Sequence, residues 1–279
     1  IMNLCQEAVH ASLHAVCVAP VYVPLAANLL RGKGVKVVTV VGFPLGASVA
    51  AVKALEARLA VEEHADEVDM VMNIAAAKNG QWDAVTAEIR LVVSSAAPQP
   101  VKVIIETVLL TDAEKQRACQ AVIDGGAAFV KTSTGFAGGG ATVADVRLLA
   151  AVANGKIGIK ASGGIRTRQQ ALALIEAGAT RIGTSAGPLL AKVEARASFK
   201  FTCWPAAARG MPSTYSLVAP ACWLMRGSAP GALPTGWRRS ASSRPTCPAF
   251  SLPMSIATMW RGCRCFAAST ACRSMPKRQ

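Results

Sequence analysis

The chain has 279 residues, with 30 Lys and Arg against 16 Asp and Glu, which gives a net charge of +14. Hydrophobic residues make up 52% of it, but the longest uncharged runs, such as Val37–Val52 and Gly210–Met225, are short and interrupted by Pro or Gly. Since a membrane-spanning helix needs about 18–20 continuous apolar residues, none of these runs predicts one.

The positive charge is confined to one end of the chain. Residues 197–279 contain 11 Lys and Arg and not one Asp or Glu, so 19 basic against 16 acidic residues leave +3 for residues 1–196. The same stretch holds six of the nine cysteines, four of the five tryptophans and nine prolines. The composition predicts two domains: residues 1–196, a regular body, and residues 197–279, a basic Pro/Arg/Cys-rich tail that is disordered or derived from a frameshift.

The body alternates short β-branched runs with stretches whose apolar residues recur three and four apart, which predicts strands alternating with helices. Seven strands are expected. This repeat indicates a parallel sheet and, at about 25–35 residues a unit, a (β/α)₈ TIM barrel of the α/β class. The expected strands are Ala15–Val18, Val35–Val41, Glu67–Asn73, Val101–Thr107, Ala127–Ser133, Lys156–Ser162 and Thr180–Thr184.

The helices between these strands have recognisable starts. Thr111 with Glu114 and Thr167 with Gln170 have the spacing of capping boxes. The body opens with a helical segment, Met2–Leu13, so the first strand of an eight-stranded barrel is expected to be lacking. Because the chain begins at Ile1, truncation at the N-terminus is the simple explanation.

Two expected strands end in a lysine, Lys131 before Thr132-Ser133-Thr134-Gly135 and Lys160 before Ala161-Ser162-Gly163-Gly164. The carboxyl ends of barrel strands form the catalytic rim, so both amines should face one site. Two ammonium groups in a desolvated pocket repel, which lowers the pKa of one of them. The neutral amine can then attack a carbonyl and form a Schiff base, as in class I aldolases. The alternative is that these lysines extend to the surface.

A carboxylate is also needed to move protons. Asp69 lies on the apolar strand Glu67–Asn73 and is the first candidate. Its alternative role is only to pair with a barrel lysine. Glu106, at the end of the next strand, is expected to serve as a hydrogen-bonding support.

The last two strands are followed by glycine-rich segments, Ser162–Arg166 and Arg181–Gly187. Glycine lets backbone N–H groups converge on an anion, and TIM barrels often bind phosphate after strands seven and eight. These loops predict a phosphate site, although simple tight turns would have the same sequence.

Taken together, these segments resemble the deoxyribose-phosphate aldolase family. The likeness covers nearly all of residues 3–190, and its strongest motif is the Thr-Ser-Thr-Gly sequence after Lys131. The similar segments are Val16–Val18, Val41–Gly46, Asp66–Val71, Phe129–Phe136, Lys160–Arg166 and Ile182–Ser185.

The resemblance implies a cytoplasmic class I aldolase of deoxyribose phosphate catabolism. Such an enzyme reversibly cleaves 2-deoxy-D-ribose 5-phosphate to D-glyceraldehyde 3-phosphate and acetaldehyde, without metal or cofactor. Its partners would be the phosphosugar and acetaldehyde, with no membrane or nucleic acid, and a homodimer is left open.

The resemblance also assigns roles. Lys131 would form the Schiff base, Lys160 would tune it, and Asp69 would relay protons. The substrate and phosphate contacts would be Cys17, Thr134, Gly135, Gly163, Gly164, Arg166, Gly183 and Ser185.

Two other functions stay open at this point. The chain could be a catalytically impaired barrel fragment that retains only phosphate binding, because the family's first strand has no counterpart before Ile1. It could also bind nucleic acid through the basic tail. The pair Cys263 and Cys265 has no second pair or His at a zinc-ligand spacing, so a metal site there is not expected.

Overall fold

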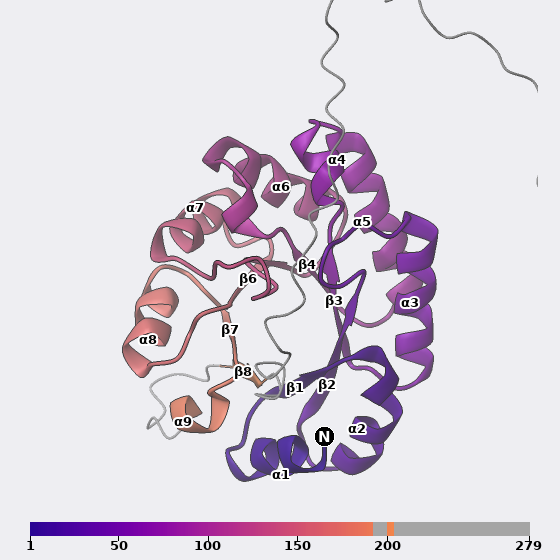
Figure 1. Ribbon diagram of the computed structural model, residues 1–279, viewed down its shortest axis with the longest axis vertical. Helices are drawn as coiled ribbons and strands as arrows, with labels where there is room; N and C mark the ends of the chain where they lie inside the picture. The colour runs from indigo at the N-terminus through magenta and orange to yellow at the C-terminus, as the bar shows by residue number, and fades with distance from the viewer. Residues whose placement is uncertain (192–199, 204–279) are drawn as a thin grey trace, which may run out of the picture. The chain divides into compact units, whose positions relative to one another are not determined.

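The computed structural model describes residues 1–191 and 200–203 (Figure 1). The chain divides into two compact units, Ile1–Val218 and Ala219–Gln279, and all described residues lie in the first. The predictions for Cys263, Cys265 and nearly all of the tail therefore concern residues outside the described part.

Eight parallel strands form a closed barrel in the order of the sequence, with the strands central in Figure 1 and the helices around them. The predicted α/β barrel and its seven strands are confirmed, each strand within a few residues of its expected bounds. The strands are β1 Ala15–Val18, β2 Lys36–Val41, β3 Glu67–Val71, β4 Val101–Ile104, β5 Phe129–Lys131, β6 Gly158–Ser162, β7 Arg181–Thr184 and β8 Lys200–Cys203.

The eighth strand comes from the segment that composition assigned to the tail. β8 pairs in parallel with β7 over four residues and with β1 over two, so it occupies the gap where a missing first strand was expected. Pairing on both sides satisfies backbone groups that would otherwise form two open sheet edges. The expected boundary after residue 196 therefore excludes four residues that belong to the barrel sheet.

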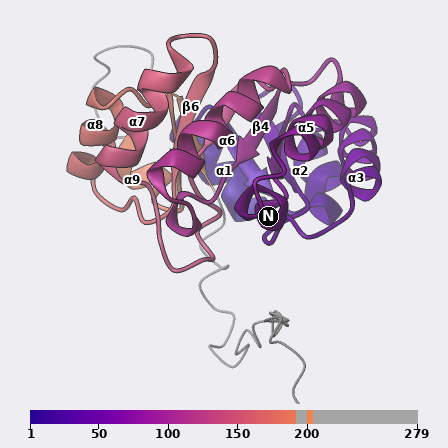
Figure 2. The ribbon, with the colours of Figure 1, turned by 90° about the horizontal axis from the view of Figure 1, so that it is seen from above.

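The helices pack around the strands, and in Figure 2 α5, α6 and α7 lie next to one another along the outside of the barrel. They are α1 Met2–His10, α2 Val23–Leu30, α3 Ala50–Glu62, α4 Ile74–Lys78, α5 Trp82–Ala96, α6 Asp112–Asp124, α7 Val143–Ala153, α8 Arg168–Glu176 and α9 Gly187–Ala191, with 3₁₀ turns η1 Pro20–Tyr22 and η2 Thr107–Leu109.

Both predicted capping boxes are present. Thr111 accepts a hydrogen bond from the Glu114 backbone N–H, and the Glu114 carboxylate accepts one from the backbone of Thr111. Thr167 and Gln170 do the same at the start of α8. Each box satisfies N–H groups that the first helical turn leaves unpaired, which is why these helices begin where they do.

The two faces of the sheet differ in character. Apolar residues on the outer faces of the strands pack against the helices in two clusters, a large one and a smaller one in which β1 and β2 meet α1 and α2. The inner faces carry a small apolar cluster of Ala15, Cys17, Val38 and Val40, together with most of the buried charged residues. Since the helices supply the main hydrophobic core, the interior of the barrel is free to hold polar groups.

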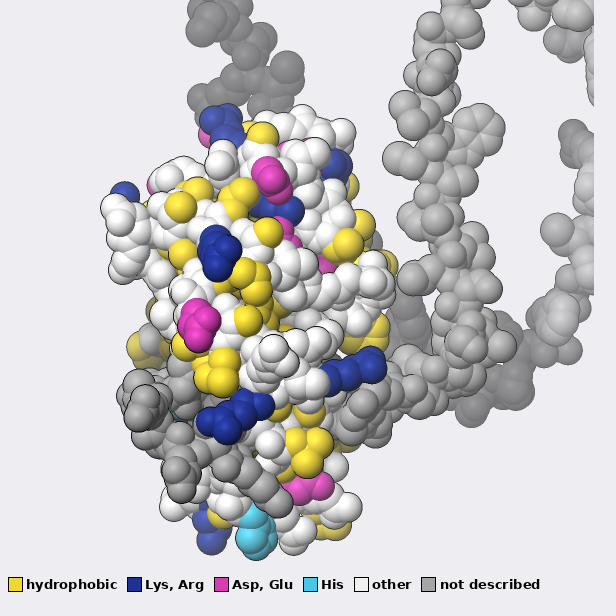
Figure 3. All heavy atoms as spheres, turned by 90° about the vertical axis from the view of Figure 1, so that its left-hand side faces the viewer, with side chains coloured by type: hydrophobic (Ala, Val, Ile, Leu, Met, Phe, Trp, Pro, Cys, Tyr) yellow, Lys and Arg dark blue, Asp and Glu magenta, His cyan; other side chains and the backbone are white. Residues whose placement is uncertain are grey.

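The described surface shows no concentration of basic charge on the face seen in Figure 3, which carries α7 and α8. Lys and Arg side chains there are separated by acidic, apolar and neutral ones, in keeping with the nearly neutral composition of residues 1–196. Among the described residues, no helix is long and apolar enough to cross a membrane.

Candidate active site

Asp69 lies at the centre of the barrel with three lysine ammonium groups around it. Its Oδ2 is 2.7 Å from the Nζ of Lys131 and 2.6 Å from the Nζ of Lys160, and its Oδ1 is 2.7 Å from the Nζ of Lys102. All four side chains are buried, with Asp69 and Lys102 fully so. The two lysines that the sequence singled out therefore share one carboxylate oxygen.

Strand register explains this convergence. Side chains two residues apart point to the same face of a strand, and residues paired between neighbouring strands lie at the same level. Asp69 pairs with Lys102, and Lys131 pairs with Lys160 on the next two strands. Closure of the barrel then brings both pairs together across its interior.

The charges in this cluster act on one another. Burial opposes ionisation of Asp69, but the positive charges of Lys102, Lys131 and Lys160 outweigh it and hold the pKa of Asp69 well below its usual range. For Lys160, burial dominates over the attraction of Asp69, and with repulsion from the neighbouring lysines it lowers the pKa to about 8. Asp69 is therefore ionised at neutral pH, while Lys160 loses its proton readily.

Lys131 behaves differently from Lys160. Burial disfavours its charged form, but the adjacent Asp69 carboxylate outweighs burial and raises the pKa of Lys131 above its ordinary value. From the sequence, Lys160 is expected to keep Lys131 neutral, whereas in this structure the lowered pKa is that of Lys160. Repulsion from Lys131 and Lys102 adds to burial in lowering the pKa of Lys160, whereas for Lys131 the attraction of Asp69, with a smaller contribution from Glu106, acts against burial.

Lys102 was missed by the sequence analysis. It lies in the middle of β4, between Val101 and Val103, and has no exposed surface. A lysine inside an apolar strand was the very signal that identified Lys131 and Lys160, so the same reasoning could have found Lys102.

A second carboxylate lies one layer below Asp69. Glu67 is two residues earlier on β3, so its side chain enters the barrel on the same face. The same Lys102 Nζ lies 2.7 Å from Glu67 Oε2, and the Arg181 guanidinium donates a short hydrogen bond to that oxygen. His14 and the half-exposed Lys36 approach Oε1 at 3.4 and 3.3 Å. Glu67 and Arg181 are not among the candidate site residues predicted from the sequence.

Cys17, expected to face the pocket, is buried inside the barrel on β1. Burial, with the negative charge of Asp69, raises the pKa of its thiol to about 11 against the effect of the lysines. The thiol is therefore protonated at neutral pH and contributes a small, uncharged wall to the site.

Glu106 supports the loop after β5, as a hydrogen-bonding residue at that position should. Its Oε2 accepts hydrogen bonds from the backbone N–H of Thr134, at 3.1 Å, and from the Thr134 hydroxyl. Glu106 has a left-handed backbone with φ of 53°, which costs energy for a residue with a side chain. The interaction fixes Thr134 at the start of the loop that contains Gly135.

The expected phosphate contacts lie on the loops after β5, β6 and β7, except Gly183, which lies within β7. Gly135 and Gly163 both have positive φ, of 89°, and the Cβ of a side chain added at Gly163 would lie 3.0 Å from the Cα of Gly140. The Ala141 N–H also bonds to the Gly163 carbonyl at 3.1 Å, so the loops after β5 and β6 are in contact. The remaining positions are Gly164 and Arg166, which are exposed, and Gly183 and Ser185, which are partly buried.

Gly183 is in direct contact with the lysine cluster. A Cβ at this position would lie 3.1 Å from the Cε of Lys160 and 3.0 Å from the Cβ of Ser162. Glycine at the end of β7 therefore leaves the space that the Lys160 side chain occupies.

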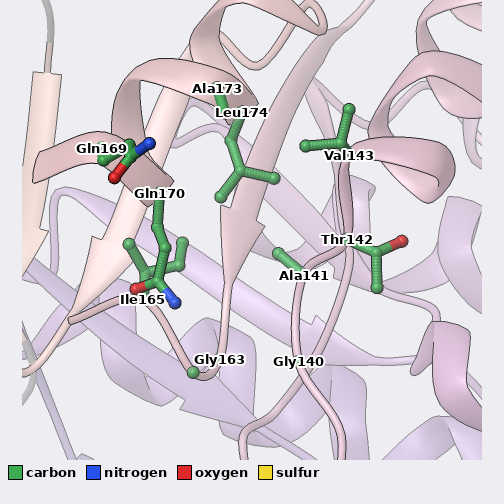
Figure 4. Close-up of a pocket in the computed structure, with 11 residues that line it drawn as sticks. Gly140, Ala141, Thr142, Val143, Gly163, Ile165, Gln169, Gln170, Ala173 and Leu174 are labelled. Atoms are coloured by element: carbon green, nitrogen blue, oxygen red, sulfur yellow. The ribbon is translucent and has the colours of Figure 1, made fainter. Parts of the chain in front are cut away.

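A cavity of about 430 Å³ lies behind the loop after β6 (Figure 4). Gly163 and Gly164 form part of its wall, and Val143, Ile165 and Leu174 give it an apolar lining. None of its eleven lining residues is charged, and the Asp69 cluster is not among them. The cavity is thus separate from the lysines. Within residues 1–191 and 200–203, no three His, Cys, Asp or Glu side chains lie close enough together to hold a metal ion.

Comparison with known proteins identifies the family of this chain. Residues 1–189 match the family described as DeoC/LacD family aldolase. The deoxyribose-phosphate aldolase of Deinococcus radiodurans is 56% identical over 187 residues, covering 67% of this chain and 85% of that protein. The enzyme of the same name from Thermococcus gammatolerans is 55% identical over 191 residues, with 67% and 85% covered.

Solved structures give the same result. The aldolase QR15 is similar with a TM-score of 0.66 and 42% identity, covering 68% of this chain and 86% of that one. A tetrameric deoxyribose phosphate aldolase from Aeropyrum pernix is similar with a TM-score of 0.63 and 34% identity, covering 68% and 81%. These matches favour an aldolase over a barrel fragment without turnover or a nucleic-acid binder. The chain therefore belongs to the DeoC/LacD family of aldolases, as the family match over residues 1–189 and relatives at 56% and 55% identity show, in agreement with the buried lysine cluster inside its barrel.

Proposed function

We propose that this protein is a class I aldolase that reversibly cleaves 2-deoxy-D-ribose 5-phosphate to D-glyceraldehyde 3-phosphate and acetaldehyde. The observation that carries the proposal is the pair of amines, Lys131 and Lys160, on one oxygen of Asp69. The substrate is the one named for the relatives.

The reaction begins with removal of a proton from Lys131. Lys160, with a pKa of about 8, is neutral in about a tenth of the molecules at pH 7 and in about half of them at pH 8. In its neutral form it can accept that proton through the shared Asp69 oxygen. Neutral Lys131 then attacks the C1 aldehyde, and loss of water forms the imine.

The protonated imine draws electrons from the neighbouring carbon. The C2–C3 bond breaks as the C3 hydroxyl loses its proton, which releases glyceraldehyde 3-phosphate and leaves an enamine on Lys131. Protonation at C2 and hydrolysis by water release acetaldehyde and restore the amine. Asp69, held by three ammonium groups, is placed to pass these protons between Lys160 and the reacting atoms.

The substrate phosphate would bind at the mouth of the barrel. The backbone of Gly135, Gly163, Gly164 and Gly183, with Ser185 and Arg166, supplies N–H groups, a hydroxyl and a positive charge on loops that follow adjacent strands. Thr134 and Cys17 would line the path between the phosphate and Lys131. A cytoplasmic location and a homodimer stay predictions.

Borohydride trapping tests the proposal. Incubation of the protein with acetaldehyde and borohydride should leave a reduced two-carbon adduct on the peptide that contains Lys131, detected by mass spectrometry. The Lys131→Met variant should lose it, and the same protein should release glyceraldehyde 3-phosphate from the phosphosugar. A folded sample with no adduct on Lys131 would exclude the mechanism.

A further inference from the structure

The barrel interior contains a second charged layer that the proposed reaction does not use. Glu67 and Phe129 come two residues before Asp69 and Lys131 on β3 and β5, and Arg181 of β7, which pairs in register with Lys160, reaches Glu67. The layers are joined by one residue, Lys102, whose ammonium contacts Asp69 and Glu67 at the same distance, 2.7 Å.

We infer that Glu67 is a positioning residue for the proposed reaction, holding Lys102 between two carboxylates so that Asp69 can serve Lys131 and Lys160. The inference rests on the proposed function and deepens it, because it names a residue outside the reacting atoms that sets the charge balance around them.

The count of charges supports this role. Four buried cations, Lys102, Lys131, Lys160 and Arg181, form their ion pairs with two buried carboxylates, Asp69 and Glu67, while a third buried carboxylate, Glu106, acts on Lys131 without forming an ion pair with it. A buried charge is costly unless it is paired, so each carboxylate must serve more than one cation. Glu67 neutralises Arg181 and part of Lys102, which leaves Asp69 Oδ2 to the two reactive lysines.

Arg181 is held beside Glu67 inside the barrel by two contacts. Its guanidinium carbon lies 4.9 Å from the centre of the Phe129 ring, and it donates to Glu67 Oε2. Planar stacking and a carboxylate partner are the interactions that a buried guanidinium favours. This arrangement keeps Glu67 ionised and aimed upward at Lys102, since its pKa is lowered by His14, Lys102 and Arg181 against the effect of burial.

Removing the charge of Glu67 should therefore lower the pKa of Lys160. Without it, Lys102 would be drawn wholly to Asp69, and the net positive charge around Lys160 would rise by one. The charged and titratable groups that face Lys160 are Asp69, Lys131, Lys102 and Cys17, and those that face Glu67 are Lys102, Arg181, Lys36 and His14.

The pH dependence of kcat/KM tests the role, because its acid limb reports the free enzyme's essential base, here Lys160. Glu67→Gln keeps the shape and the hydrogen-bond acceptor but removes the charge, so the limb should move to lower pH by about half a unit. Arg181→Gln removes the positive charge that Glu67 contacts, so the limb should move the opposite way, to higher pH. It also serves as the test if Glu67→Gln does not fold.

Glu88→Gln is the matched control. Glu88 is also a buried carboxylate paired with a buried lysine, but it lies between α3 and α5, outside the barrel. This variant should lose stability and leave the limb where it is. The rate of borohydride trapping on Lys131, measured at each pH, gives a second readout of the limb for every variant.

Shifts of opposite sign for Glu67→Gln and Arg181→Gln, with none for Glu88→Gln, would support the role. Unmoved limbs in folded variants whose unfolding temperatures fall would show that Glu67 is only structural, and would overturn the inference alone. If the unaltered protein forms no adduct on Lys131, the proposed function fails and the inference fails with it.

Discussion

Two buried charged clusters in this protein differ in how many ammonium groups share one carboxylate. Outside the sheet, Lys53 of α3 pairs with Glu88 of α5, with its Nζ 2.8 Å from Oε1. The remaining groups are also satisfied, since Lys53 donates to the Val71 carbonyl and Glu88 accepts from the Asn73 N–H. Inside the sheet, Asp69 is shared among three ammonium groups.

The difference separates a structural ion pair from a reactive one. The Lys53–Glu88 pair matches one cation with one anion in direct contact and ties α3 and α5 to the end of β3. Burial lowers the pKa of Lys53, against the attraction of Glu88 and Glu56, but no second ammonium group among the described residues repels it. In the inner cluster cations exceed carboxylates, so at least one amine is destabilised in its charged form, which is the condition for a nucleophile or base at neutral pH.

The largest expected effect is the loss of turnover in Asp69→Asn, which removes the charge at the centre of the inner cluster. The amide cannot balance three ammonium groups or carry a proton between Lys131 and Lys160, so turnover of the phosphosugar should fall by about 10²–10⁴-fold. Steady-state kinetics measure the loss, and circular dichroism confirms the fold. Turnover within a few-fold of the unaltered protein would mean that the carboxylate only holds the lysines in place.

The next largest expected effect is the loss of turnover at acid pH. Lys160 is protonated below its pKa of about 8 and cannot then accept a proton, so activity should be lost as the pH falls through that value. The loss should approach about tenfold for each pH unit well below it. Measurement of kcat/KM from acid to alkaline pH checks this.

Lys160→Met is the control for the pH profile. The variant should lack the limb near pH 8, because the group that titrates there has been removed. A limb that persists unchanged in this variant would assign the titration to another residue.

Lys53→Met should have the smallest effect on turnover and a large one on stability. It leaves the Glu88 carboxylate buried without its cation, so unfolding should become easier by about 3–5 kcal/mol, while turnover per folded molecule changes within a few-fold. Urea denaturation followed by circular dichroism gives the free energy of unfolding.

Two further variants sharpen this result. The double variant Lys53→Met/Glu88→Leu removes both charges and should recover much of the loss. Arg58→Ala breaks an exposed pair with Glu62 on the same helix, and should change the free energy of unfolding by about 1 kcal/mol or less. A Lys53→Met protein as stable as the unaltered one would show that the pair contributes nothing.

Much of the fold could be predicted from local patterns. The β-branched runs and the spacing of Thr111 with Glu114 and of Thr167 with Gln170 depend on residues close together in the chain, and the structure has strands and helix starts at those positions. Lys131 and Lys160 were also visible, because a lysine at the end of an apolar strand stands out in any sequence.

The strand β8 and the roles of Glu67 and Arg181 could not be predicted from local patterns. β8 was missed because a four-residue strand in a segment of foreign composition gives no periodic signal, and only the unpaired edges of β7 and β1 select it. Glu67 and Arg181 were missed because each is an ordinary charged residue in sequence, and they meet only when strands 114 residues apart close the barrel.

By itself, the sequence determined the alternation of strands and helices and the face of each strand on which a charged residue falls, since both follow from periods of two and 3.6 residues. Only the tertiary structure decided which cations share which carboxylate and which lysine has the lowered pKa. Those properties depend on distances between strands far apart in the chain and on burial, and both arise when the sheet closes.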